Sequence, residues 1–105
     1  MPTYLIADIR VINQQRYDEY RPLVRDAVQC FGGRYVVRTS DIGVVDGGWA
    51  PPRLIMIEFP TRAAAAFYNS HDYREARDLR SNAAMMDMVP LQEVPVDDAP
   101  NSTFL

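Results

Sequence analysis

The chain has 105 residues, 48% of them hydrophobic, and a net charge of −3. This length suits one domain, and the apolar fraction excludes a disordered main body. All eleven basic residues are arginines, with acidic residues spread among them; without a basic stripe, nucleic acid is not an expected partner. No apolar run approaches the ~20 residues of a membrane-spanning helix, so a membrane is not expected either.

The N-terminal third of the chain predicts a strand and a long helix. Side chains alternate in character along residues 3–11, which is typical of a strand. A helix is expected to begin after the N-cap Asn13 and to continue to about Phe31, because apolar residues recur there at helical spacing. Pro22 interrupts this stripe, so it should either kink the helix or start a second piece. Gly32 follows the last apolar residue and is expected to have a positive φ.

Two further strands follow, joined by a long connection. The second strand runs from about Arg34 to Ser40, and the third covers residues 53–59. Residues 41–52 contain Asp46-Gly47-Gly48 and Pro51-Pro52 and are expected to form a loop. Strict alternation divides the second strand between two faces, with Tyr35, Val37 and Thr39 on one and Arg34, Val36 and Arg38 on the other.

The second half of the chain predicts two helices and an edge strand. Thr61 and Ser70 are suitable N-caps, and an alanine-rich segment follows the first of them. Pro90 lies in the last predicted strand and suits a sheet edge, where its missing N–H costs no ladder bond. The predicted ranges are 62–69 and about 72–83 for the helices, about 85–94 for the strand, and 95–105 for a loosely held tail.

The order β-α-β-β-α-β is that of the ferredoxin-like split βαβ fold, an α+β architecture. We expect one such domain over residues 1–94, with the first and third strands parallel at the centre of the sheet and the helices covering one face. The other face would remain apolar, which indicates a second copy packed sheet against sheet; the alternative is a monomer with an apolar open face. Its apolar residues are Tyr4, Ile6, Val36, Leu54 and Met56.

Three segments resemble the signature of a known family. They are Gly32-Gly33-Arg34-Tyr35, Glu58-Phe59-Pro60, and Phe67-Tyr68-Asn69-Ser70-His71-Asp72-Tyr73 with Arg80. In this order they resemble the DUF1330 family of small proteins of unknown function, over roughly residues 3–94. The resemblance implies a dimeric α/β barrel of the ferredoxin-like type. That superfamily also includes cofactor-independent monooxygenases, muconolactone-isomerase-like enzymes and haem-handling proteins. The resemblance implies no particular reaction.

The expected register predicts a polar cluster on the uncovered face. An antiparallel pairing that puts Arg34 opposite Glu58 puts Arg38 opposite Leu54, and a parallel first strand would bring Asp8 near Glu58. Neighbouring carboxylates beside arginines can divide acid and base roles, so Glu58 and Asp8 are candidate catalytic groups. Arg34, Arg38 and Glu58 are candidate ligand contacts. The alternative is a structural ion pair between strands.

Three single residues carry further hypotheses. His71, the only histidine, is a third catalytic candidate because it can titrate near neutrality, although residues at helix starts are usually exposed. One histidine and one cysteine cannot complete a zinc site, so no metal is expected, and no cofactor is indicated. Cys30 is expected to be a small buried hydrophobic residue. Trp49 could close a pocket as a lid or anchor a partner subunit, and the anchor is favoured.

Five tyrosines are many phenols for a core of this size. Their default role is packing with hydrogen-bonded hydroxyls; the alternative is a pocket between the helices and the sheet, in which the hydroxyls orient a small ligand. On the second interpretation, Trp49, Tyr20, Tyr73 and Arg80 are candidate ligand contacts. The five are Tyr17, Tyr20, Tyr35, Tyr68 and Tyr73.

Two functional hypotheses remain open at this point. In the first, a homodimer binds a small organic molecule and acts, by superfamily analogy, as a cofactor-independent monooxygenase- or isomerase-like enzyme. In the second, it is a non-catalytic structural or regulatory module whose polar cluster is structural. A cytoplasmic location is expected, because the single cysteine cannot form an internal disulfide and the N-terminus reads as a strand rather than a signal peptide.

Overall fold

The computed structural model describes residues 2–92, and only the backbone of residues 63–65, 71 and 72. The predicted α+β, ferredoxin-like order is confirmed, with its second helical region divided in two. In that described part, no helix has the length and apolar character needed to cross a membrane. The elements are β1 (Thr3–Val11), α1 (Gln14–Cys30), β2 (Arg34–Thr39), β3 (Leu54–Phe59), α2 (Ala63–Tyr68), α3 (His71–Arg80) and β4 (Ala84–Gln92).

The four described strands form one sheet in the order β2-β3-β1-β4. β1 runs antiparallel to β3, with Leu5 opposite Ile57 and Asp8 opposite Leu54, so the prediction of a parallel central pair was wrong. The physical reason is the connection: a helical crossover makes β1 and β2 parallel, and β3, inserted between them, runs antiparallel to both. β4 is an edge strand, as Pro90 predicted.

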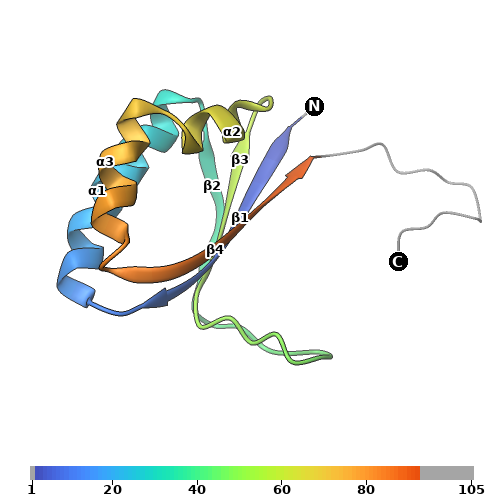
Figure 1. Ribbon diagram of the computed structural model, residues 1–105. Coiled ribbons are helices and arrows are strands. Elements are labelled where there is room, and N and C mark those ends of the chain that lie inside the picture. Colours follow the sequence, from blue (N-terminus) through green and yellow to red (C-terminus); the bar gives the residue numbers. More distant parts are fainter. Residues whose placement is uncertain (1, 93–105) are drawn as a thin grey trace, which may run out of the picture.

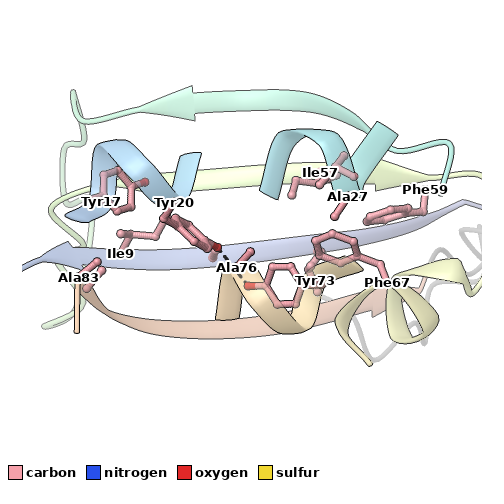
Figure 2. Close-up of a cluster of buried hydrophobic side chains, with 14 residues drawn as sticks. Ile9, Tyr17, Tyr20, Ala27, Ile57, Phe59, Phe67, Tyr73, Ala76 and Ala83 are labelled. Atoms are coloured by element: carbon pink, nitrogen blue, oxygen red, sulfur yellow. Dashed lines mark hydrogen bonds between the residues drawn. The ribbon is translucent and has the colours of Figure 1, made fainter. Parts of the chain in front are cut away.

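The helices lie on one face of the sheet, and Figure 1 shows α1 and α3 side by side against it. We call the other side of the sheet the open face. Side chains of β1 alternate between the two, so that Leu5, Ala7 and Ile9 are buried while Tyr4 and Ile6 are only half-buried. Figure 2 shows the aromatic part of this core. Its largest fully buried side chains are Tyr17, Tyr73, Phe59, Phe67, Ile9 and Val28.

β2 contains an irregularity that strict alternation did not predict. Arg34 lies opposite Glu58 and Tyr35 opposite Ile57, but the register then shifts, so that Val37 lies opposite Met56 and Arg38 opposite Ile55. Such a bulge adds one residue to one strand and exchanges the faces of all later side chains. Val37 therefore lies on the open face and Arg38 on the helix-covered face, which reverses both assignments.

The helix ends follow the sequence closely. The Asn13 and Ser70 side chains accept hydrogen bonds from the backbone N–H groups of Arg16 and Tyr73, as expected of N-caps. Gly32 has a φ of 74°, which confirms the predicted left-handed conformation after α1. Pro22 lies inside α1, which continues past it as one element. Cys30 is exposed, so the prediction of a buried cysteine was wrong; it occupies the last turn of α1, away from the core stripe.

The connection between β2 and β3 is a loop, as predicted, and extends beyond the end of the sheet (Figure 1). Two hydrogen bonds join its second half to β1. The Ile9 backbone N–H donates to the Arg53 carbonyl at 2.9 Å, and the Trp49 indole N–H donates to an Asp8 carboxylate oxygen at 2.8 Å. The predicted tail, 95–105, and the last two residues of the predicted final strand lie outside the described residues.

Candidate ligand-binding site

A cavity of about 690 Å³ lies between α1 and the helix-covered face of the sheet. α1 contributes one wall, with Tyr17, Tyr20 and Val24, and all four strands contribute the other. Phe67 of α2 also lines it. The cavity exists because α1 packs chiefly against α3 and its inward side chains do not fill the space above β2 and β3. The remaining apolar lining comes from Ala7, Ile9, Ile55, Ile57, Met86 and Met88.

A pair of buried phenols supplies polar groups to this region. The Tyr20 and Tyr73 hydroxyls lie 3.1 Å apart, and Figure 2 shows them pointing toward each other from α1 and α3. Burial raises the pKa of both phenols, so both stay protonated over the physiological range. Arg80 acts electrostatically on both rings, and its Nε is buried without a hydrogen-bond partner among the described residues.

Four arginines line the same cavity, together with a single acid, Asp18. The guanidinium carbon of Arg38 lies 5.3 Å from the centre of the Tyr35 ring, and that of Arg53 lies 5.1 Å from the centre of the Tyr17 ring. Both distances suit cation–π contacts. Burial raises the pKa of Tyr35 even though Arg38 and Arg25 oppose the shift. The four arginines are Arg21, Arg25, Arg38 and Arg53.

The polar cluster predicted on the open face forms only in part. Arg34 Nε donates to a Glu58 carboxylate oxygen at 3.0 Å, across the register that the alternation predicted. Asp8 lies opposite Leu54, four residues along β1 from Tyr4, which faces Glu58. That offset separates the two carboxylates by roughly 13 Å along the strand. The prediction that Asp8 lies near Glu58 was thus wrong, because β1 and β3 run in opposite directions.

The other sequence-predicted residues are dispersed. Arg38 and Tyr20 line the cavity, whereas Glu58 and Trp49 do not. Trp49 is 62% exposed, and its indole N–H donates a hydrogen bond to the Asp8 carboxylate on the open face. His71 begins α3, and its side chain lies outside the described residues. Among the side chains that the structure describes, no three from histidine, cysteine, aspartate or glutamate gather where a metal ion could be held.

Sequence reasoning missed three of the four arginines that line the cavity. Because Leu54 and Met56 were predicted on the open face, alternation puts Ile55, Ile57 and also Arg53 on the covered face, so the sequence already carried this signal. Arg21 and Arg25 follow Tyr17 at intervals of four, along the border of the α1 stripe. Neither signal distinguishes a cavity from an ordinary solvated helix border, because the void itself is a tertiary feature.

Comparison with solved structures confirms the fold. A protein of unknown function from Rhodopseudomonas palustris superposes with a TM-score of 0.68 at 19% identity, covering 90% of this chain and 84% of that one. A dimeric ferredoxin-like protein of unknown function from Thermobifida fusca gives 0.58 at 14% identity, with 87% and 90% covered. A candidate antibiotic biosynthesis monooxygenase from Nitrosomonas europaea gives 0.56 at 17% identity, with 90% and 100% covered. At such identities the likeness concerns the fold alone.

Sequence comparison identifies the family but no activity. None of the curated proteins matches the chain significantly. A family model described as a domain of unknown function matches residues 2–94, which include the glycine pair, the Glu-Phe-Pro segment and the α2–α3 junction. The chain therefore belongs to the DUF1330 family.

Proposed function

We propose that the cavity beneath α1 binds a small organic molecule and that this is the function of the fold. The carrying observation is the cavity itself, at about 690 Å³. Ligand sites in proteins usually measure 300–1,000 Å³, have mostly apolar walls, and contain a few convergent polar groups. The isoleucines and methionines supply such walls, and the phenols and arginines supply the polar groups.

A cavity-filling substitution tests this proposal. We would screen a library of small metabolites by thermal shift against the parent and against Ile55→Trp, because Ile55 lines the cavity. Ile12→Trp is the matched control, since Ile12 is 62% exposed and lies outside the lining. Some compounds should raise the melting temperature of the parent and the control but not of Ile55→Trp. If Ile55→Trp misfolds by circular dichroism, Met88→Trp replaces it.

Two outcomes would contradict the proposal. The first is that no compound stabilises the parent. The second is that compounds stabilise Ile55→Trp as strongly as the parent, which would place binding elsewhere on the protein.

The phenol pair favours an enzymatic form of this function. With the Tyr73 hydroxyl donating to its oxygen, the Tyr20 hydroxyl, which belongs to the cavity lining, can donate one hydrogen bond to an enolate oxygen. An enolate is the species formed when a proton leaves carbon next to a carbonyl. Isomerisation passes through this species, and so does cofactor-independent oxygenation of an enolisable substrate. The monooxygenase-like neighbour supports this by fold analogy only. Incubating the library hits with enzyme and O₂, followed by mass spectrometry, tests it; turnover should fall in Tyr20→Phe.

We also propose that the protein is a homodimer joined through the open face. Four large side chains of that face, Val37, Met85, Val89 and Leu91, are at least one-third exposed in the single chain. They surround Ile6 and Met56, which are paired across β1 and β3. Contiguous apolar surface of this kind usually marks an interface, and one neighbour is described as dimeric. Light scattering should give twice the 12.0 kDa mass of one chain.

The non-catalytic alternative rests on the Arg34–Glu58 pair. This pair lies on the open face, where the Arg34 side chain is 69% exposed and that of Glu58 is 26% exposed. In the proposed dimer it would border the interface and fix orientation rather than contact a ligand. Glu58→Gln should therefore weaken association without changing ligand affinity. Lost affinity at unchanged mass would return Glu58 to the binding site.

We also propose that the protein is located in the cytoplasm. The exposed thiol of Cys30 suits a reducing compartment, where no partner disulfide would form. Cell fractionation with a thiol-trapping reagent should recover the protein in the cytoplasmic fraction with Cys30 reduced.

A further inference from the structure

We propose that the ligand of this cavity is an organic carboxylate with an aromatic or otherwise apolar body, held by Arg38 and Arg53. This inference rests on the proposed function and specifies its ligand class. The chain as a whole carries a net charge of −3. The lining of its cavity carries four arginines against one aspartate. Cationic charge is thus concentrated at one hollow of an acidic protein, which attracts an anion of matching size.

Two of the four arginines have acidic partners and two do not. Arg21 Nη1 lies 4.0 Å from Asp18 Oδ1, and Arg25 Nε lies 3.9 Å from Oδ1 of the neighbouring Asp26. Neither Arg38 nor Arg53 forms an ion pair with any acid whose side chain the structure describes. These two cations lie beside the cavity with their charge uncompensated, and a bound carboxylate would neutralise it.

The ring contacts of these two side chains leave their hydrogen-bond donors available to an anion. Arg38 lies over the Tyr35 ring and Arg53 over the Tyr17 ring. A cation–π contact uses the positive charge of the guanidinium and does not require its N–H groups as hydrogen-bond donors. The rings therefore fix the position of each cation without using its hydrogen-bond donors. A carboxylate prefers this planar, forked arrangement of donors.

The bulge in β2 brings the two arginines together. Arg38 lies opposite Ile55, and Arg53 is two residues from Ile55 on the same parity. Arg53 immediately precedes β3, and its carbonyl accepts a hydrogen bond from the Ile9 N–H of β1. In a sheet, residues related in this way are diagonal neighbours, about 7–8 Å apart. Two long side chains starting at this spacing can reach the two oxygens of one carboxylate. With regular alternation, Arg38 would lie on the open face and the pair would not exist.

The rest of the lining defines the body of the ligand. Phe67 and the thioethers of Met86 and Met88 form apolar walls away from the arginines. Thioether sulfur contacts aromatic rings favourably and adapts to irregular shapes. The Tyr20 hydroxyl, paired with that of Tyr73, can donate to a carbonyl or hydroxyl oxygen at the far end. The geometry thus suits an apolar acid with a second oxygen function.

A matched pair of probes tests the inference. We would measure the binding of 2-naphthoate and of its uncharged amide, 2-naphthamide, by isothermal titration calorimetry against the parent, Arg38→Gln, Arg53→Gln and Arg74→Gln. Arg74 is exposed on α3 and does not line the cavity, so its substitution changes the net charge equally. Inorganic phosphate added as a competitor separates general anion binding from recognition of an organic acid.

The parent should bind 2-naphthoate at least about tenfold more tightly than 2-naphthamide. Affinity for 2-naphthoate should fall about tenfold in Arg38→Gln, which alters an exposed arginine, and about thirtyfold in Arg53→Gln, which alters a half-buried one. Affinity for 2-naphthamide should hardly change, and Arg74→Gln should bind both probes as the parent does. Phosphate should compete only weakly.

Four results would overturn the inference. The first is equal binding of both probes by the parent. The second is an equal loss of 2-naphthoate affinity in Arg74→Gln and the cavity variants. The third is strong competition by phosphate, which would indicate an inorganic anion site. The fourth is failure of both probes while the library screen yields uncharged ligands that Ile55→Trp excludes; the cavity would then keep its function and lose the proposed ligand class. A screen without any ligand would overturn both proposals.

Discussion

Two neighbouring glycines are required for different physical reasons. Gly32 has a φ of 74°, a conformation that costs any residue with a β-carbon about 1 kcal/mol. Gly33 has no such conformation, but a β-carbon there would lie 2.7 Å from a ring atom of Phe59 and 2.8 Å from a methyl group of Val28. The first constraint could be predicted because it belongs to the end of a helix. The second could not, because it depends on a strand 26 residues away in sequence.

Alanine substitution should separate these two constraints. Gly32→Ala should lower the free energy of unfolding by about 1 kcal/mol, and Gly33→Ala by about 2–3 kcal/mol because Phe59 and Val28 are held in the core and cannot move apart cheaply. Gly43→Ala, where a β-carbon would meet no atom within 4 Å, should change it little. Urea unfolding gives the three values, and equal losses at Gly32 and Gly33 would contradict the close packing.

The buried phenols make the protein sensitive to alkali. Desolvation raises the pKa of Tyr20 and Tyr73 above the usual value near 10. Below pH 10 both the folded and the unfolded chain hold these protons, and stability is fully present. As pH rises above 10 the unfolded chain releases them first, so each such tyrosine removes up to ~1.4 kcal/mol per pH unit.

Stability measured at pH 8 and at pH 11 tests this. The parent should lose a large part of its free energy of unfolding between the two values. Tyr20→Phe should start about 1–2 kcal/mol lower at pH 8, because the buried Tyr73 hydroxyl loses its partner. It should then lose less than the parent on going to pH 11. A variant that loses as much as the parent would show that Tyr20 ionises normally in the folded protein.

At the scale of elements, the bulge in β2 decides the candidate site. Hydrophobic alternation correctly predicted the strands and the Arg34–Glu58 register, because both depend on which face of a strand is buried. It placed Arg38 on the wrong face, because one extra residue moves every later side chain of the strand to the opposite face. No residue type near Val36 indicates a bulge. A cavity site that depends on this reversal could not be derived from the sequence pattern.

Pro22 interrupts the hydrogen-bond pattern of α1. It lies inside the helix and cannot donate the hydrogen bond that an interior residue normally makes to the carbonyl four residues earlier. It is also exposed and lines the cavity, so its replacement creates no buried void. We expect Pro22→Ala to raise the free energy of unfolding by about 1–2 kcal/mol, less than the full ~3 kcal/mol of an interior proline, because proline also restricts the unfolded chain. Urea unfolding measures this.

A decrease in stability would contradict that account and would show that the proline ring makes contacts worth more than the missing hydrogen bond. Ligand affinity measured on the same variant is informative as well. Because Pro22 contributes to the cavity wall, a change in affinity at raised stability would indicate that the local geometry of α1 is adjusted to the ligand rather than to folding.

At the scale of the whole molecule, the two faces of the sheet have different proposed roles, ligand binding on one and dimerisation on the other. The helix-covered face holds the core and the cavity. Figure 1 shows no described helix over the open face, whose apolar side chains Val37, Met85, Val89 and Leu91 are exposed. The sequence predicted this open face from residues of β1, β2 and β3, but it missed the contribution of β4. Met85, Val89 and Leu91 of β4 lie opposite Arg10, Ile6 and Tyr4 of β1. The sequence pattern alone did not predict this pairing of β4 with β1.

A charged residue at the centre of the open face tests the proposed assembly directly. Met56 lies at its centre, opposite Ile6 of β1 and Val37 of β2. In the proposed dimer, Met56→Glu would bury a carboxylate without a partner, which costs several kcal/mol. Association should weaken by at least about a hundredfold, so that light scattering at micromolar concentration reports the mass of one chain. Gln15→Glu, in the first turn of α1, adds the same charge to an exposed position in the helix layer and should remain dimeric. Because the cavity lies on the other face, monomeric Met56→Glu should still bind the library hits. A monomeric parent would remove the interface, and a dimeric Met56→Glu would move it to another surface.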